Sequence, residues 1–223
     1  MESAGDNQRE KNDVVKKDTF PVSFALEEIK NNITITTNSA SKKSKEQIIK
    51  QAFKFHLQGN IQEAEKLYQN FIHRGFIDHR VFCNYGVILK NLGKSREAEL
   101  LIRKAIKIKP DFPDAYSNLG IILRDLGNLK EAETSIRKAI KIKSDFPDAY
   151  SNLGIILIDL GNLKEAEISI RKAIDLNPNS AENHSILGEI LKDLGNLKEA
   201  EILMRKAIDL NPSSAEYYYR ISQ

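Results

Sequence analysis

Few side chains in this 223-residue chain could carry out chemistry, and most of those recur at a fixed interval. The four histidines are His56, His73, His79 and His184, and none has a second ligand at the spacing of a metal site. The single cysteine, Cys83, allows no intrachain disulfide and takes a position that holds serine in later parts of the chain. The sequence therefore predicts no metal, no cofactor and no reactive thiol, and it predicts that His184 packs in the core.

Paired carboxylates and basic pairs are also present, but each type recurs through the chain. Glu131 and Glu133 resemble an acid and base pair, yet their equivalents lie 34 residues away on either side. An active site is rarely repeated several times, so we expect a structural role. Arg137 follows Glu133 by four residues, an orientation worth about 0.2–0.5 kcal/mol on a helix. The repeated basic pairs predict a solvated convex face, and an RNA- or anion-binding stripe is the alternative.

One recurrent polar side chain has the chemistry of a binding residue. Asn84, Asn118 and Asn152 lie 34 residues apart, each just before a Leu-Gly or Tyr-Gly pair. An amide offers both a donor and an acceptor, so a row of amides could hold the backbone of an extended peptide. Ile186 takes the next position, so the predicted row of amides, an asparagine ladder, has three members. The alternative is that asparagine is only repeat filler.

Neighbouring residues complete the predicted peptide site. Arg80 and Lys90 are expected to form a basic end, while carboxylates accumulate toward the C-terminal end. Val87, Ile121 and Ile155 are expected to form an apolar floor. An extended ligand would then place its acidic part near Arg80 and Lys90. A charge gradient without function is the alternative.

These residues must be positioned by a repeated structural unit. Residues 113–146 and 147–180 are identical at 26 of 34 positions. Glycines continue the same period in both directions, at Gly59, Gly93, Gly127, Gly161 and Gly195. Such self-similarity is the sequence signature of a solenoid or another repeat architecture.

Each unit is predicted to form two antiparallel helices. In residues 113–126, apolar side chains recur at spacings of three and four, which places them on one helical face. Gly127 suits the left-handed position that ends a helix, and Asn128 with Glu131 predicts a capping box at the start of the next. Gly120 and Ala132 are small residues that predict a close approach of the two helices.

The 34-residue unit resembles the tetratricopeptide repeat. In residues 147–180 the matching positions are Tyr150, Leu153, Gly154, Leu157, Ala166, Ile170, Ala173 and Pro178. The resemblance extends over residues 45–223 and implies an all-α fold, a right-handed α-solenoid whose first helices line a concave groove. The asparagine spacing resembles the superhelix of O-linked N-acetylglucosamine transferases, where such side chains hold an extended peptide.

This resemblance predicts the organisation of the chain. The predicted units are a degenerate repeat at 45–78, full repeats at 79–112, 113–146, 147–180 and 181–214, and a partial capping helix at 215–223. Residues 1–44 are predicted to be mostly disordered, with an apolar stretch at 19–35 that is either a short helix or a docking segment for a partner. The C-terminal segment is either a minimal cap or, through Tyr217, Tyr218 and Tyr219, a site of weak self-association.

Composition narrows the function classes. The net charge of +3 and the lack of aromatic residues on a basic face argue against nucleic-acid binding. No apolar run reaches membrane-spanning length, and the N-terminus lacks the apolar core of a signal peptide. The sequence predicts a cytoplasmic, non-enzymatic protein-interaction scaffold that binds an extended peptide. The alternative is a substrate-recruiting module for a transferase whose catalytic domain is absent from this chain.

Overall fold

The computed structural model describes residues 44–221, which form helices and connecting turns without a β-strand. The helices are α2 (Lys45–Leu57), α3 (Ile61–His73), α4 (His79–Asn91), α5 (Ser95–Ile108), α6 (Pro113–Asp125), α7 (Leu129–Ile142), α8 (Pro147–Asp159), α9 (Leu163–Leu176), α10 (Ala181–Asp193), α11 (Leu197–Leu210) and α12 (Ala215–Ile221). This architecture confirms the predicted α-solenoid. None of the helices in residues 44–221 is long and apolar enough to cross a membrane.

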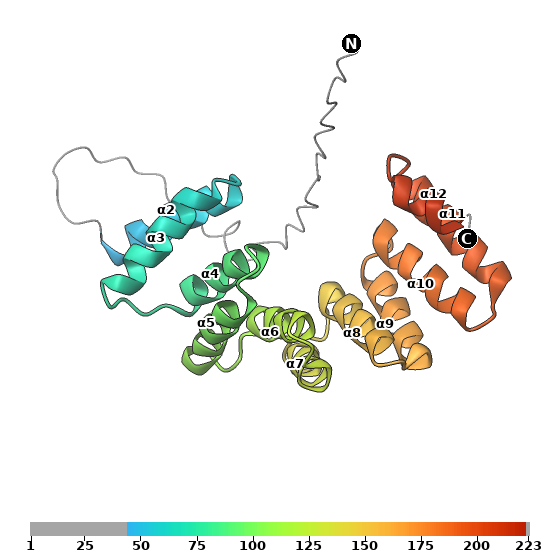
Figure 1. Ribbon diagram of the computed structural model, residues 1–223, viewed down its shortest axis with the longest axis horizontal. Coiled ribbons are helices and arrows are strands. Elements are labelled where there is room, and N and C mark those ends of the chain that lie inside the picture. The colour runs from blue at the N-terminus through green and yellow to red at the C-terminus, as the bar shows by residue number, and fades with distance from the viewer. Residues whose placement is uncertain (1–43, 222–223) are drawn as a thin grey trace, which may run out of the picture.

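The helices follow one another in antiparallel pairs and form an open arc (Figure 1). Within each pair, α4 packs on α5, α6 on α7, α8 on α9 and α10 on α11. Neighbouring pairs also touch through their first helices, because α6 contacts both α4 and α8. First helices that approach one another lie on the inner side of a curved array, and Figure 1 shows them there. The first helices therefore line the concave face.

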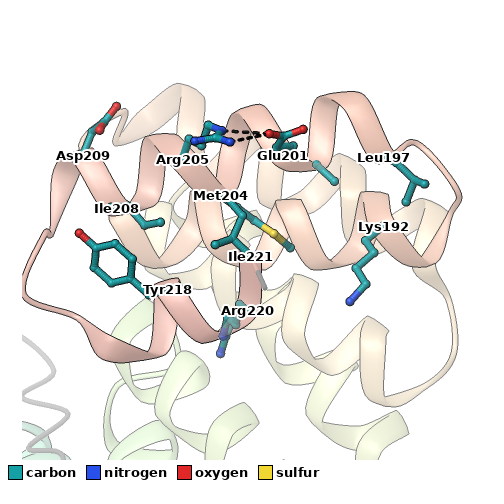
Figure 2. A pocket seen from close by; sticks show the side chains of 11 residues that line it. Lys192, Leu197, Glu201, Met204, Arg205, Ile208, Asp209, Tyr218, Arg220 and Ile221 are labelled. Carbon is teal, nitrogen blue, oxygen red and sulfur yellow. Dashed lines mark hydrogen bonds and ion pairs between the residues drawn. The ribbon is translucent and has the colours of Figure 1, made fainter. Parts of the chain in front are cut away.

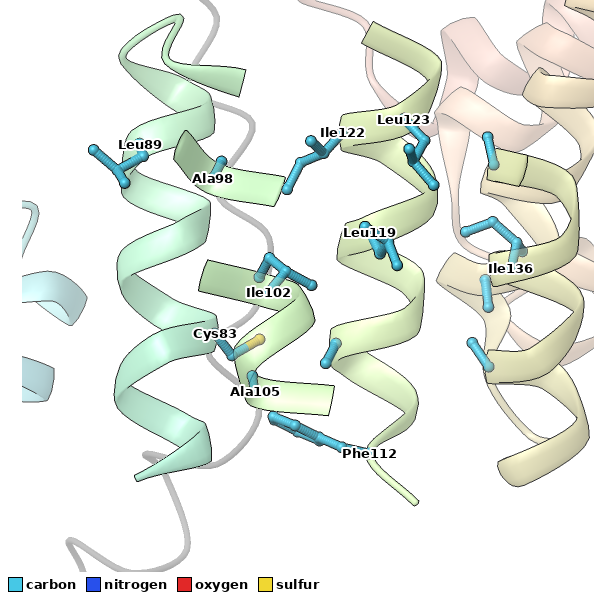
Figure 3. Packing of buried hydrophobic residues seen from close by; sticks show 14 of the residues in the cluster. Cys83, Leu89, Ala98, Ile102, Ala105, Phe112, Leu119, Ile122, Leu123 and Ile136 are labelled. Carbon is cyan, nitrogen blue, oxygen red and sulfur yellow. The ribbon is translucent and has the colours of Figure 1, made fainter. Parts of the chain in front are cut away.

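The core runs continuously from one repeat to the next. Side chains from α4, α5, α6 and α7 contribute to it, as Figure 3 shows. Gly120 lies so close to α7 that a methyl group in its place would sit 2.5 Å from Ile136 Cδ1 and 3.1 Å from the Ala132 carbonyl oxygen. The predicted close approach is confirmed; Gly86 and Gly154 likewise face an isoleucine, and Gly188 faces Met204.

The prediction of a capping box at the turn between the two helices of a repeat was wrong. Gly127 has the expected positive φ of 79°. Its N–H donates to the Arg124 carbonyl and the Asn128 N–H donates to the Leu123 carbonyl, which is a Schellman motif. In a capping box, the same Asn128 N–H would have to donate to the Glu131 side chain, so the two motifs exclude one another. The Asn128 side chain also makes no cap hydrogen bond. Glu131 is then available to another partner.

A capping box occurs instead at the start of the first described helix, where Ser44 and Gln47 bond reciprocally. The degenerate repeat at 45–78 contains the helix pair α2 and α3, which buries Ile48, Tyr68 and Phe71. The predictions for the apolar stretch at 19–35 and for the rest of residues 1–43 fall outside the described residues.

Candidate peptide-binding groove

The three asparagines predicted to form a ladder lie on the first helices of successive repeats. Asn84 is on α4, Asn118 on α6 and Asn152 on α8, and all three side chains are half-buried. They lie on the helices that line the concave face, where a ligand could reach the exposed part of each amide.

Each ladder amide is also held by a neighbouring structural element. The Asn118 Nδ2 donates to Cys83 Sγ over 3.4 Å, and the Asn152 Nδ2 donates to Ser117 Oγ over 3.3 Å. In both cases the partner lies 35 residues earlier, in the preceding repeat. Asn84 instead bonds the hydroxyl of Tyr68, whose pKa is raised by burial and lowered in part by this contact. One N–H of each bonded amide orients the group, and the second N–H and the carbonyl oxygen remain for a ligand.

The sequence did not predict how the interruption at Ile186 is accommodated. Ile186 is buried, so Ser151 has no amide donor 35 residues later, and its hydroxyl donates to Asn183 Oδ1 over 2.6 Å. In the last described helix, the Arg220 guanidinium takes the ladder position and donates to Ser185 Oγ over 3.2 Å. The contact of Arg220 has the same interval of 35 residues as the asparagine contacts, whereas Ser151 and Asn183 lie 32 residues apart.

Four of the predicted site residues meet in one shallow crease between α4 and α6. Val87 and Lys90 come from α4, and Asn118 and Ile121 come from α6. The crease has a volume of about 10 Å³, the size of one water molecule. Ile155 takes the corresponding position on α8, one repeat further on, and is half-buried. The concave face is therefore a shallow surface here and not a pocket that could enclose a ligand.

Carboxylates of the chain itself partly neutralise the positive charge at the basic end of the predicted site. Arg80 binds Asp78 through two nitrogens, at 3.0 and 3.1 Å, and its guanidinium also lies 3.8 Å from Glu46. Hydrogen bonds and charge from Arg80 outweigh the burial of Asp78 and hold the pKa of that carboxyl below its usual value. Lys90 lies 4.0 Å from Asp125 of the next repeat. These pairs leave less positive charge at this end than the sequence suggested.

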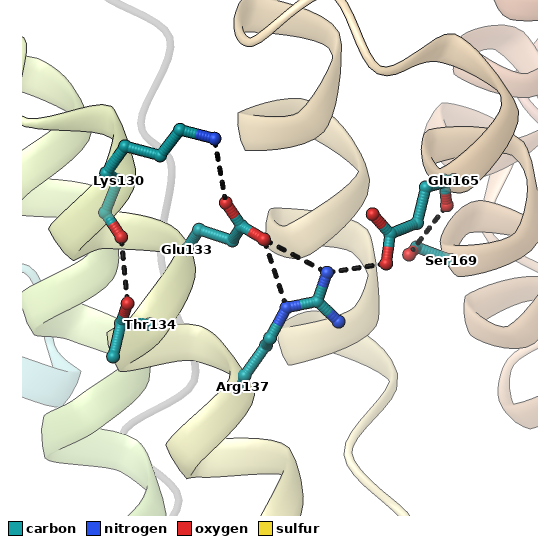
Figure 4. Close-up of polar contacts among 6 residues, drawn as sticks. All are labelled: Lys130, Glu133, Thr134, Arg137, Glu165 and Ser169. Carbon is teal, nitrogen blue, oxygen red and sulfur yellow. Dashed lines mark hydrogen bonds and ion pairs between the residues drawn. The ribbon is translucent and has the colours of Figure 1, made fainter.

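A second charged row runs along the outer helices. Arg137 bonds Glu133 on its own helix and Glu165 of the next repeat, at 3.1 and 2.5 Å (Figure 4). The intrahelical pair confirms the prediction, whereas the pair between repeats was not predicted. Arg103 and Arg171 make the equivalent two contacts. The arginines of the convex face therefore connect repeats, which favours the structural interpretation over an anion-binding stripe.

The other candidate chemical groups lie in packed surroundings. Burial raises the pKa of the Cys83 thiol to about 12, so this thiol is a poor nucleophile at neutral pH. His184 is buried as predicted, and its Nδ1 lies 2.9 Å from the Ser180 carbonyl oxygen. His79 packs edge-on against Phe112, with ring centroids 5.1 Å apart. Among residues 44–221, no three His, Cys, Asp or Glu side chains are grouped so that they could hold a metal ion.

The stacked helix pairs and the continuous inner face define a helical-repeat solenoid of the kind that binds other proteins. Models of the tetratricopeptide repeat match residues 79–112, 101–134, 120–161, 147–180 and 181–214. Together these matches cover more than half of the chain, and the chain belongs to the tetratricopeptide repeat family. No curated protein matches the sequence.

Solved structures support the same fold. MamA from Desulfovibrio magneticus RS-1 is 21% identical with a TM-score of 0.67, and the match covers 79% of this chain and 99% of that one. YrrB, described as a TPR protein with an unusual peptide-binding site, is 18% identical with a TM-score of 0.64, covering 91% and 100%. A thermophilic TPR protein of Thermus thermophilus is 19% identical with a TM-score of 0.65, covering 80% and 97%. At these identities the likeness extends to the fold alone.

Proposed function

We propose that this chain is a non-catalytic scaffold that binds an extended peptide segment of a partner protein along its concave face. The observation that carries this proposal is the crease where Asn118 lies beside Val87, Lys90 and Ile121. It offers an amide, an apolar floor and one ammonium group on a surface that continues onto the next repeat. An extended peptide presents the complementary features, which are backbone amides in a row and alternating side chains.

Recognition in this groove would depend on the peptide backbone more than on its charge. Asn118 and Asn152 are spaced by one repeat and are oriented by Cys83 and Ser117, so their free amide atoms point to fixed places. Arg80 and Lys90 are paired with carboxylates of the chain itself, so they would add selectivity only by exchanging partners. The transferase-recruiting alternative would use the same groove, and its support is the asparagine spacing.

The experiment is a selection from a library of random peptides displayed on phage, with the full chain immobilised. Each selected peptide is then measured against Asn118→Ala/Asn152→Ala and against the matched control Asn128→Ala/Asn162→Ala. The control asparagines are exposed, lie in the turns between helices and make no side-chain cap hydrogen bond. We expect the groove pair to weaken binding about thirtyfold, from about 1 kcal/mol for each of the two lost hydrogen bonds, with no change in the control.

The stability of the two double variants separates a binding role from a structural one. Each groove asparagine makes one long hydrogen bond to the preceding repeat, so we expect the groove pair to lose less than about 1 kcal/mol of unfolding free energy. Equal binding by the groove variant and the wild type would contradict the proposal. A loss of several kcal/mol would show that the asparagines are structural amides instead.

A further inference from the structure

The repeat at 181–214 exposes a stripe of side chains that is only partly exposed in the three repeats before it. Leu197, Glu201 and Arg205 lie four residues apart along α11, so they share one face of that helix. Their equivalents Glu167 and Arg171 have side-chain exposures of 26% and 41%, compared with 58% for Glu201 and 67% for Arg205. Leu197 is 64% exposed, whereas Leu163 one repeat earlier packs against the core.

This stripe borders an open groove between α10, α11 and α12. The groove has a volume of about 640 Å³ and an apolar centre formed by Met204, Ile208 and Ile221 (Figure 2). Charged groups of both signs surround that centre, at Lys192, Glu201, Arg205, Asp209 and Arg220. Arg171 bonds Glu167 on its own helix and Glu199 of the following repeat. Within residues 44–221, Arg205 bonds Glu201 on its own helix and has no second carboxylate partner.

The opposite end of the described array does not fit this groove. Inside the array, a first helix covers the preceding repeat with Ala115, Leu119 and Ile122, all of which are buried. At the same positions α2 carries three polar residues, Gln47, Gln51 and Lys54. An amide or ammonium group placed against Met204 and Leu197 would lose its hydration, and no apolar side chain would be buried in return. Head-to-tail stacking of two chains is therefore unfavourable.

We propose that a second copy of this chain covers the groove, with the two α11 helices packed antiparallel across a two-fold axis. The axis would pass between Glu201 and Arg205, so each would face its counterpart, Glu201 opposite Arg205 of the partner subunit and the reverse. Leu197 near one end of the stripe would meet Ile208 of the partner subunit near the other. A patch that carries opposite charges four residues apart is complementary to itself in this arrangement.

The proposal is tested by sedimentation equilibrium of the full chain at concentrations from about 10 to about 500 µM, the range for a small interface. The wild type should approach twice the monomer mass of 25.3 kDa. Glu201→Arg and Arg205→Glu should each weaken the dimer at least about tenfold, because each places like charges in contact twice. An equimolar mixture of these two variants should regain the dimer, because every Arg then faces a Glu.

A matched pair of apolar substitutions tests the location of the interface. Leu197→Asp should abolish the dimer, whereas Ile168→Asp should leave it unchanged, although Ile168 is 68% exposed on the outer face of the preceding repeat. Circular dichroism of every variant serves as the control for folding, and all of them should keep the helical signal of the wild type. A wild type that stays monomeric at the highest concentration would overturn the proposal. So would a dimer that persists in both charge variants or a mixture that stays monomeric.

Discussion

Substituting Gly120 with alanine tests the close contact between the two helices of a repeat. The added methyl group would lie 2.5 Å from both Cγ1 and Cδ1 of Ile136. Carbon atoms pack best at about 3.5–4.0 Å, so Ile136 would have to move by about 1 Å or more within a packed core. Such overpacking costs about 1–3 kcal/mol, while replacing glycine in a helix gains about 1 kcal/mol. We expect Gly120→Ala to lower the free energy of unfolding by about 1 kcal/mol.

A double-mutant cycle identifies the clash as the cause. Ile136→Ala removes both the Cγ1 and the Cδ1 atom and should cost about 2–5 kcal/mol by itself. In the double variant neither clashing atom is present, so it should be at least as stable as Ile136→Ala alone. Urea unfolding followed by circular dichroism measures all four proteins.

Gly127→Ala is the matched control, because a methyl group there meets no atom within 4 Å but Gly127 has a φ of +79°. It should cost about 1–2 kcal/mol through backbone strain and show no coupling to Ile136→Ala. If Gly120→Ala raised the unfolding free energy, helix propensity would outweigh packing and the close-contact argument would be refuted.

Three further outcomes are expected. Deletion of residues 147–180 removes one whole repeat and should leave a folded, shorter and less stable solenoid. Deletion of 147–160 alone should destroy the packing of the neighbouring repeats, and the helical circular dichroism signal distinguishes the two variants. The Cys83 thiol should resist Ellman's reagent at pH 8 in the native protein and react on unfolding in urea, because burial raises its pKa to about 12; fast native reaction would contradict its burial. Burial lowers the pKa of His56 and of His79, so the unfolded chain binds more protons and stability should fall as the pH drops below about 6.5. His56→Asn should reduce this loss in urea titrations at pH 5 and pH 8, and an unchanged pH dependence would exclude His56 as a source.

The sequence predicted the repeated architecture because repetition amplifies weak local signals. Apolar residues at spacings of three and four, a glycine after each first helix and small residues such as Gly120 each occur several times. The prediction failed at Asn128, where two local motifs need the same backbone N–H. The Schellman motif uses that N–H in the structure, and the sequence offered no way to rank one motif above the other.

The contacts between repeats were harder to predict. A search for repetition finds identical residues at an interval of 34, whereas the interacting residues differ in type and lie 28 or 35 apart. Arg103 with Glu131 and Lys90 with Asp125 are such pairs. Both intervals depend on how one helix pair is rotated against the next, which is a property of the superhelix and not of any single repeat. The sequence therefore predicted Arg80 and Lys90 as a basic end without the carboxylates that offset them.

The same geometry connects the candidate site to the stability of the array. Asn118 and Asn152 are each oriented by a small residue of the preceding repeat, Cys83 and Ser117 respectively. An isolated helix pair would have the same asparagine but no partner to fix its amide, and rotation about its side-chain bonds would have to be lost on binding. Stacking provides this order before a ligand arrives. A groove of the proposed kind would thus be a property of neighbouring repeats together, and its residues would have to recur at the period of the fold.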